Sequence, residues 1–354
     1  MKGPLLLLAA LPGGRTAAAR LVDGRLEDLL IDPPPDDPAP RPGAIHLGVL
    51  GRPMKGAGGA FVDLGSGQTG FLRETRGLAP GRAVLVQVSG WAEPHKAAPV
   101  SRRLLVKGRL AILTPGAPGH NLARSTPEEA RPRLEALASR AMADAPADLG
   151  LVLRTAAVEA ADDEILAEIA ALRADCAQLA GKDPAPGLRR AAPTAAEEAR
   201  RDWPDPGAIV YEGPDAFDQH AVWETVTALL ASSVPLPTGG RLHVEPTRAL
   251  VAIDVDTGTD ASPAAALKAN LAAARELPRQ LRLRGLGGPV LVDFAPLPKK
   301  DRQRVADALK AALARDGIET TLAGWTPIGN LELLRKRARR PLADLIKGAL
   351  PPGV

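Results

Sequence analysis

The sequence is poor in cysteine and aromatic residues and has no long apolar run. Cys176 is the only cysteine among 354 residues, which excludes an intrachain disulfide and a zinc site made of cysteine pairs. No apolar run approaches the roughly 20 residues that span a bilayer. The Walker A, GxSxG and HExxH motifs are missing as well. These absences exclude disulfide-stapled and membrane-spanning classes and favour a cytoplasmic protein.

The remaining composition is that of a globular protein. Hydrophobic residues make up 45% and charged residues 24%, and the length is sufficient for two or three compact units. Basic residues number 45 against 41 acidic ones, and most of the basic residues are arginine, which suits phosphate contacts. Coding bias explains the same composition equally well, so an anionic partner is one of two open readings.

The first half of the chain is rich in β-prone runs. The start, MKGPLLLLAALPGGRTAAAR, is similar to a weak signal peptide, but strand, Pro-Gly-Gly turn and strand is the better interpretation. The proline-rich segment 31–43 is expected to be a linker. Five short runs then match the count and size of a small OB-type barrel, and they cover residues 44–51, 59–64, 69–72, 82–88 and 104–113.

The second half alternates between helix and strand patterns. An amphipathic helix over 162–180 has Cys176 on its apolar face, and 182–207 is expected to be a linker or loose insert. Later elements are a helix (218–231), a hairpin (240–245 and 249–256), a helix capped by Ser262 and kinked at Pro278 (262–284), a strand (289–294), a helix (299–315), a strand (320–325) and a basic helix from residue 330.

Three aspartates end two of these strands. In ALVAIDVDTG the strand period places Asp254 and Asp256 on one face, and in GPVLVDFAP Asp293 lies near the carboxyl end. If the strands are neighbours, the three carboxylates converge, and their mutual repulsion favours a hard cation such as Mg²⁺ or Mn²⁺. Aspartates before Thr257-Gly258 also form turns routinely, so the stretch alone leaves both interpretations open.

Basic and aromatic residues are the other candidate ligand contacts. Lys268, Arg275, Arg279 and Arg282 share one helix face, which could hold a phosphate backbone or simply be solvated, and RKRARR at 335–340 is equally ambiguous.

Two aromatic side chains fall in the barrel candidate. Phe61 and Phe71 could stack on unpaired bases or fill the core. The string GSGQTG between them matches a dinucleotide fingerprint as text, but it opens no helix and is interpreted as a hairpin.

Four blocks of the chain resemble the ribonuclease E/G family of bacterial endoribonucleases: AFVDLGSGQTGFL, VPLPTGGRLHVEPTRALVAIDVDTG, NLAAARELPRQLRLRGLGGPVLVDFAP and GNLELLRKR. The resemblance implies an α+β multidomain fold. Its expected parts are an RNase H-like subdomain (1–40 and 208–248), an inserted S1-type OB domain (41–120), a 5′-sensor segment (121–181), a linker or shortened insert (182–207) and a DNase I-like catalytic subdomain (249–350).

The same resemblance implies Mg²⁺-dependent cleavage of single-stranded RNA that leaves 5′-phosphate and 3′-hydroxyl ends. The implied site residues are Asp254 and Asp293 as metal ligands, Asp256 as a third catalytic residue, Phe61, Phe71, Lys96, Arg279 and Arg282 as RNA contacts, and Arg154 and Thr155 as receptors of a 5′-phosphate.

The chain also departs from the family pattern. Asp256 stands where the family has asparagine, Leu47 where an OB strand often has lysine, and the cysteines of the family's zinc link are missing. A zinc-linked oligomer is therefore not expected, and a monomer or dimer is. Two alternatives stay open: a catalytically weak or inactive RNA-binding member of the family, and a phosphodiesterase that acts on DNA.

Overall fold

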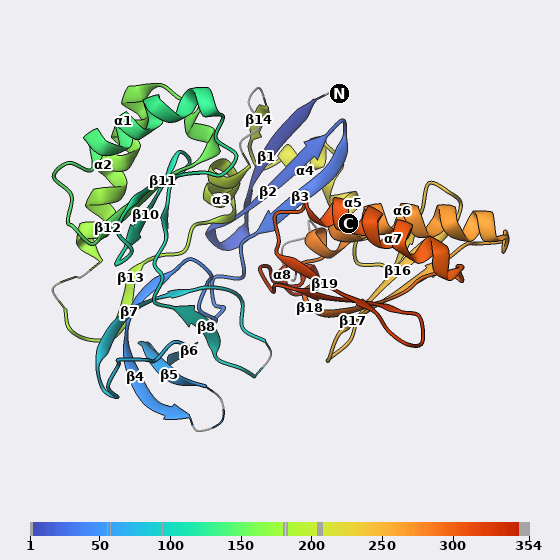
Figure 1. Cartoon of the computed structure of the whole chain (residues 1–354), viewed down its shortest axis with the longest axis horizontal. Helices are drawn as coiled ribbons and strands as arrows, with labels where there is room; N and C mark the ends of the chain where they lie inside the picture. The colour runs from blue at the N-terminus through green and yellow to red at the C-terminus, as the bar shows by residue number, and fades with distance from the viewer. Residues whose placement is uncertain are drawn as a thin grey trace. The chain divides into compact units, whose positions relative to one another are not determined.

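The computed structural model describes residues 3–54, 56, 58–93, 95–179, 181, 183–203 and 208–346. The chain forms two compact units, of which the first combines Met1–Pro35 with Gly207–Val354 and the second is Asp36–Pro206 (Figure 1). The second unit is thus inserted into the sequence of the first.

The first unit begins with a four-stranded sheet in the order β14-β1-β2-β3. The predicted strand, Pro-Gly-Gly turn and strand is confirmed, because β1 and β2 pair antiparallel around residues 12–14. Two short helices follow β14, so the predicted helix at 218–231 is interrupted, with Ala221 in the left-handed region at φ 52°. The elements are β1 (Pro4–Leu11), β2 (Arg15–Val22), β3 (Arg25–Ile31), β14 (Ile209–Glu212), α4 (Ala216–Gln219), α5 (Val222–Ala228) and α8 (Leu342–Leu345).

The rest of the first unit is a six-stranded sheet in the order β15-β16-β17-β18-β20-β19. Its neighbours β17 and β18 are parallel and joined by helix α6, which Ser262 caps by accepting a hydrogen bond from the Ala265 amide at 3.2 Å. The elements are β15 (Ser233–Pro235), β16 (Arg241–Pro246), β17 (Val251–Asp256), α6 (Pro263–Leu283), β18 (Gly288–Asp293), α7 (Lys299–Leu313), β19 (Thr320–Trp325) and β20 (Leu331–Arg335).

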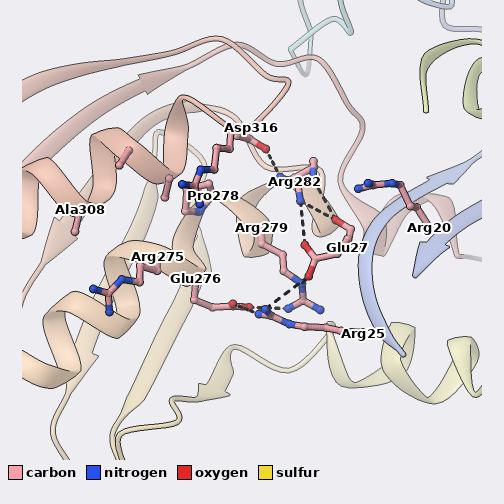
Figure 2. A pocket seen from close by; sticks show the side chains of 13 residues that line it. Arg20, Arg25, Glu27, Arg275, Glu276, Pro278, Arg279, Arg282, Ala308 and Asp316 are labelled. Atoms are coloured by element: carbon pink, nitrogen blue, oxygen red, sulfur yellow. Dashed lines mark hydrogen bonds and ion pairs between the residues drawn. The ribbon is translucent and has the colours of Figure 1, made fainter. Parts of the chain in front are cut away.

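Helix α6 is fastened to strand β3 by two arginines. Arg279 Nε donates to the Leu26 carbonyl at 2.7 Å, and an Arg282 guanidinium nitrogen donates to the Glu27 carbonyl, also at 2.7 Å. Figure 2 shows both side chains directed at Glu27. The two sheets of the first unit are therefore connected by charge-assisted hydrogen bonds, which are stronger than neutral ones.

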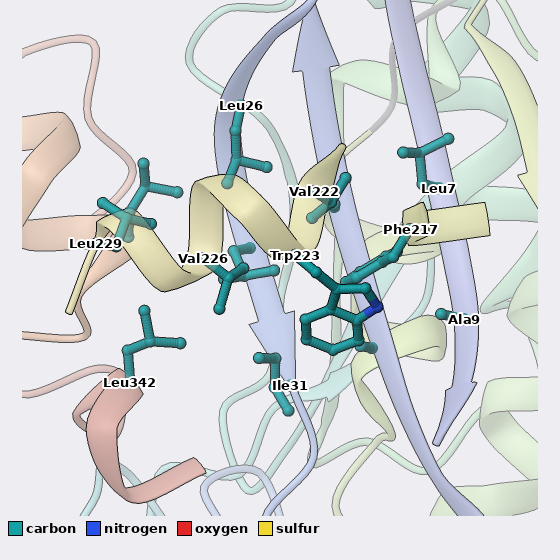
Figure 3. Close-up of a cluster of buried hydrophobic side chains, with 14 of the residues drawn as sticks. Leu7, Ala9, Leu26, Ile31, Phe217, Val222, Trp223, Val226, Leu229 and Leu342 are labelled. Carbon is teal, nitrogen blue, oxygen red and sulfur yellow. The ribbon is translucent and has the colours of Figure 1, made fainter. Parts of the chain in front are cut away.

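A hydrophobic cluster joins distant parts of the first unit. Phe217 and Trp223, from α4 and α5, pack on the four-stranded sheet with their ring centroids 5.0 Å apart, and Leu342 from α8 closes the cluster (Figure 3). Phe217 is fully buried, and burial of such a side chain stabilises a fold by about 1.5–3 kcal/mol. The two ends of the first unit's sequence therefore share one core.

The second unit contains a closed barrel of β4, β5, β6, β8 and β7, which the β4–β7 pairing closes. This arrangement fits an OB-like fold, as predicted, with one correction. The run at 104–113 is not a barrel strand: its two strands belong to another sheet, and β8 takes the place in the barrel. The strands are β4 (Ile45–Met54), β5 (Gly59–Gly65), β6 (Gln68–Leu72), β7 (Ala83–Val88) and β8 (Ala98–Ser101).

The remaining elements of the second unit form a sheet in the order β11-β12-β10-β9 with two helices. The segment expected to be a linker or loose insert contains regular elements within 183–203: β13 pairs with β4, and α3 starts at a capping box of Thr194 and Glu197. The elements are β9 (Val106–Lys107), β10 (Ala111–Pro115), β11 (His120–Leu122), α1 (Arg131–Ala141), β12 (Leu149–Leu153), α2 (Asp162–Gln178), β13 (Gly187–Arg190) and α3 (Ala195–Asp202).

The prediction of a basic helix from residue 330 onward is wrong. Residues Leu331–Arg335 form strand β20, in which Leu331, Leu333 and Arg335 are buried and the residues between them are exposed. Among the described residues, no helix is both long and apolar enough to span a membrane.

Candidate active site on the open face of the six-stranded sheet

The two faces of the six-stranded sheet differ in chemistry. Val251, Ile253 and Val255 of β17 point into a core with α6 and α7, whereas the alternate residues of the strand face the other way. Asp254 and Asp256 lie on this second side, as does Asp293 of β18, and all three are exposed. We call this side the open face.

Strand register makes Asp254 and Asp293 direct neighbours. The two residues are Cα partners at the carboxyl ends of the parallel strands β17 and β18. Adjacent strands lie about 4.8 Å apart, so the carboxylates project side by side. In the described part of the chain neither carboxylate accepts a hydrogen bond or joins an ion pair. The two hard oxygen donors therefore fit a small divalent cation that keeps several waters.

Asp256 has a different environment from the other two aspartates. It pairs in register with Arg241 of β16, and its Oδ1 accepts a hydrogen bond from the Gly258 amide. No group of three or more histidine, cysteine or acidic side chains that could hold a metal occurs within the described ranges. The register brings Asp254 and Asp293 together, Asp256 accepts the hydrogen bond that closes the turn after β17, and its expected part in a site of three carboxylates stays a prediction.

Two residues beside this pair were not predicted. His243 of β16 is the Cα partner of Asp254, and Arg241 is that of Asp256. Arg241 also donates to the Ser233 hydroxyl at 2.8 Å. Their signal in the sequence is the alternation of Arg241 and His243 with the buried Leu242 and Val244, which puts them on the open face. Only the hairpin register shows which aspartate each one faces.

The predicted RNA contacts Arg279 and Arg282 lie on the helical side of the sheet. Their side chains are 14% exposed. Both form ion pairs with Glu27, Arg279 also pairs with Glu276, and Arg282 also pairs with Asp316. Because α6 packs against the face opposite Asp254, this placement does not fit the predicted role of orienting RNA beside the acidic pair.

The predicted aromatic contacts lie on the outside of the barrel. Phe61 and Phe71 are Cα partners on β5 and β6, their ring centroids are 5.6 Å apart in an edge-to-face arrangement, and Phe61 is 43% exposed. Neither ring is buried in the core. Lys96 is also exposed and pairs with Glu93 at 2.9 Å. The rings are therefore accessible for stacking on bases.

The predicted 5′-phosphate receptor Arg154 is occupied by a carboxylate within the second unit. Its guanidinium forms an ion pair with Asp202 at 2.9 Å and donates to the Gly108 carbonyl at 2.7 Å, and Thr155 shares a 2.6 Å hydrogen bond with Ser125. Burial tends to raise the pKa of Asp202, but hydrogen bonding and charge from Arg201, followed by the charges of Arg154 and Lys107, hold that pKa below its usual value. The ionised Asp202 thus already engages the Arg154 guanidinium.

The fold and the site define a mixed α+β protein with an OB-like barrel and a carboxylate pair on an open sheet face. Comparison with known proteins gives the family. Residues 194–338 match the sequence model of the Ribonuclease E/G family. Ribonuclease E of Nostoc sp. is 29% identical over 367 residues, which cover 87% of this chain and 53% of that protein.

Other relatives agree. Ribonuclease G of Salmonella typhimurium is 24% identical over 371 residues, covering 87% of this chain and 75% of that protein. A ribonuclease E/G-like chloroplastic protein of Arabidopsis thaliana is 35% identical over 142 residues, or 38% of this chain and 14% of that protein. The chain spans about half the length of its Nostoc relative. Residues 194–338 thus match the ribonuclease E/G family, and the resemblance noted in the sequence is confirmed.

Proposed function

We propose that this chain is an endoribonuclease of RNA processing or decay that cleaves single-stranded RNA with Mg²⁺ or Mn²⁺, which Asp254 and Asp293 would hold. The observation that carries the proposal is the register pairing of these two exposed aspartates inside the family-matched segment. Neither has a partner among the described residues, so the pair keeps both its charge and its accessibility.

The reaction is hydrolysis of a phosphodiester bond. A water oxygen attacks phosphorus, the bond from phosphorus to the 3′ oxygen breaks, and that oxygen takes a proton, which leaves a 5′-phosphate and a 3′-hydroxyl. The bound cation would activate the water and neutralise charge that develops on the phosphate. Asp254 and Asp293 fix the position of that cation, and the side chains of Arg241 and His243 border the same face.

Substrate binding would use the second unit as well. The exposed pair of Phe61 and Phe71 would stack on unpaired bases, and Lys96 would contact the backbone. Arg154 and Thr155 would receive a 5′-monophosphate. Because Asp202 occupies Arg154, we expect the 5′ end to be sensed more weakly than an unoccupied arginine would allow.

A cleavage assay with end analysis tests the proposal. The full chain is incubated with a 5′-monophosphorylated single-stranded RNA, with Mg²⁺ or with EDTA, beside the Asp254→Asn/Asp293→Asn protein. We expect Mg²⁺-dependent products with 5′-phosphate and 3′-hydroxyl ends from the wild type only. Equal cleavage by both proteins would refute the assignment. Cleavage of a DNA strand of the same sequence would identify a general phosphodiesterase.

Asp256 supports a second candidate, an RNA-binding protein with weak or lost turnover. Asp256 stands where the family pattern has asparagine, and its carboxylate accepts the hydrogen bond of a turn. Its extra negative charge would oppose the approach of the scissile phosphate. This candidate predicts salt-sensitive RNA binding without any metal-dependent product. Asp256→Asn separates the two: a product that appears only in the variant supports the second candidate, and one already formed by the wild type contradicts it.

A further inference from the structure

The helical side of the six-stranded sheet contains a pocket lined mainly by arginines. Its volume is about 520 Å³, within the range of small-ligand sites. Its described lining residues include six arginines and three carboxylates, so the lining has a formal charge of +3. Ala308, Ala311 and Ala312 of α7 form part of the wall and leave room beside the longer side chains (Figure 2). The pocket therefore combines space with excess positive charge.

Part of this charge is held rigidly by carboxylates. Arg279, Arg282 and Arg25 pair with Glu27, Glu276 and Asp316, and Figure 2 shows them as one connected chain of contacts. Burial tends to raise the pKa of Glu276, but hydrogen bonding from Gln280 and the charges of Arg279 and Arg25 hold it below its usual value. The three carboxylates are therefore already engaged by arginines of the lining.

Two other arginines of the lining are not engaged. Arg275 of α6 and Arg315, just after α7, are exposed, and among the described residues neither guanidinium has a hydrogen bond or an ion pair. They come from two neighbouring helices and border the same pocket. A solvated helix face explains each of them singly, but it does not explain why both border a preformed cavity whose acidic residues are all engaged by the other arginines of the lining.

We propose that this pocket binds phosphate groups, with Arg275 and Arg315 as the contacts that the ligand completes. A guanidinium presents a planar set of donors that matches phosphate oxygens in bidentate geometry. The phosphate could belong to an RNA backbone or to a free polyphosphate such as a nucleoside triphosphate. Only the RNA source rests on the proposed nuclease function.

Binding measured without cleavage tests the proposal. The full chain in EDTA is titrated with tripolyphosphate by calorimetry, and with a labelled 5′-hydroxyl single-stranded RNA by anisotropy. Arg275→Gln/Arg315→Gln is compared with Lys300→Gln/Lys310→Gln, which removes the same charge from exposed positions of α7 outside the pocket. We expect tripolyphosphate affinity to fall about tenfold or more in the arginine variant and less than about twofold in the lysine variant.

The two ligands identify the source of the phosphate. If the arginine variant also loses RNA affinity and tripolyphosphate competes with RNA, the pocket holds the RNA backbone. If only tripolyphosphate binding falls, the ligand is a free polyphosphate, and this holds even if the protein binds no RNA and the proposed nuclease function fails. Equal losses in both variants, or no tripolyphosphate binding by the wild type, would overturn the proposal.

Discussion

The carboxylate pair makes a prediction about stability that does not depend on cleavage. Asp254 and Asp293 are register neighbours on strands about 4.8 Å apart, and both are exposed. Two unit charges about 5 Å apart repel by about 0.8 kcal/mol at the dielectric constant of water. Replacing Asp254 by asparagine removes the repulsion and keeps the shape of the side chain. In EDTA the variant should therefore be more stable than the wild type, by about 2–3 °C in melting temperature.

Mg²⁺ should reverse this order. A cation present at ten times its dissociation constant stabilises the wild type by about 1.4 kcal/mol. The Asp254→Asn protein should gain much less stability, because it lacks one of the two metal ligands. Thermal unfolding with and without Mg²⁺ measures both effects. Asp256→Asn is the matched control: it lies on the same strand and face, but the Asp256 carboxylate accepts a hydrogen bond from the Gly258 amide and its Cα partner is the cationic Arg241, so no gain in EDTA is expected. If Asp254→Asn is less stable than the wild type in EDTA, or if Mg²⁺ does not stabilise the wild type, the reasoning is wrong.

Three further predictions test other parts of the chain. Asp316→Asn should lower the free energy of unfolding by about 3–5 kcal/mol in urea, because the fully buried Arg335 loses the carboxylate 2.5 Å away; a loss below about 1 kcal/mol would contradict this. Asp202→Asn should increase the preference for 5′-monophosphate over 5′-hydroxyl RNA by releasing Arg154, and an unchanged ratio of cleavage rates would count against the sensor assignment. Burial, and then the charge of Asp175, raise the pKa of the Cys176 thiol to about 11, so at pH 8 iodoacetamide should alkylate it about a hundredfold more slowly than in the unfolded chain.

The sequence predicted the elements around the site well because their burial follows a simple period. Val251, Ile253 and Val255 alternate with exposed residues, and Ser262 with Pro263 marks the start of α6. Only two short strands and one helix are needed to bring Asp254 and Asp293 together, so the local pattern was sufficient there.

Elements whose burial depends on distant partners were missed. In β20 the alternation of Leu331, Leu333 and Arg335 was hidden because a buried arginine looks like an exposed one until its carboxylate, Asp316, is placed. Helix α3 had a usable signal in the Thr194-x-x-Glu197 capping box, but its proline- and alanine-rich surroundings favoured a linker. The residues beside Asp254 were missed for a similar reason, since hairpin register is a property of two strands.

The charges of the first unit explain why the two sides of its six-stranded sheet favour ligands of opposite charge. On the helical side of the sheet, Arg279 and Arg282 form ion pairs with Glu27, Glu276 and Asp316 rather than with the aspartates of the open face. The acidic pair has no cationic partner among the described residues and therefore favours a cation, while Arg275 and Arg315, which form no ion pair there, favour an anion. A single helix, α6, leads from the strand of Asp254 to the arginine pocket. A phosphate ligand on one side and a metal on the other thus act on separate charges, and binding of tripolyphosphate should leave the Mg²⁺-dependent change in melting temperature unaltered.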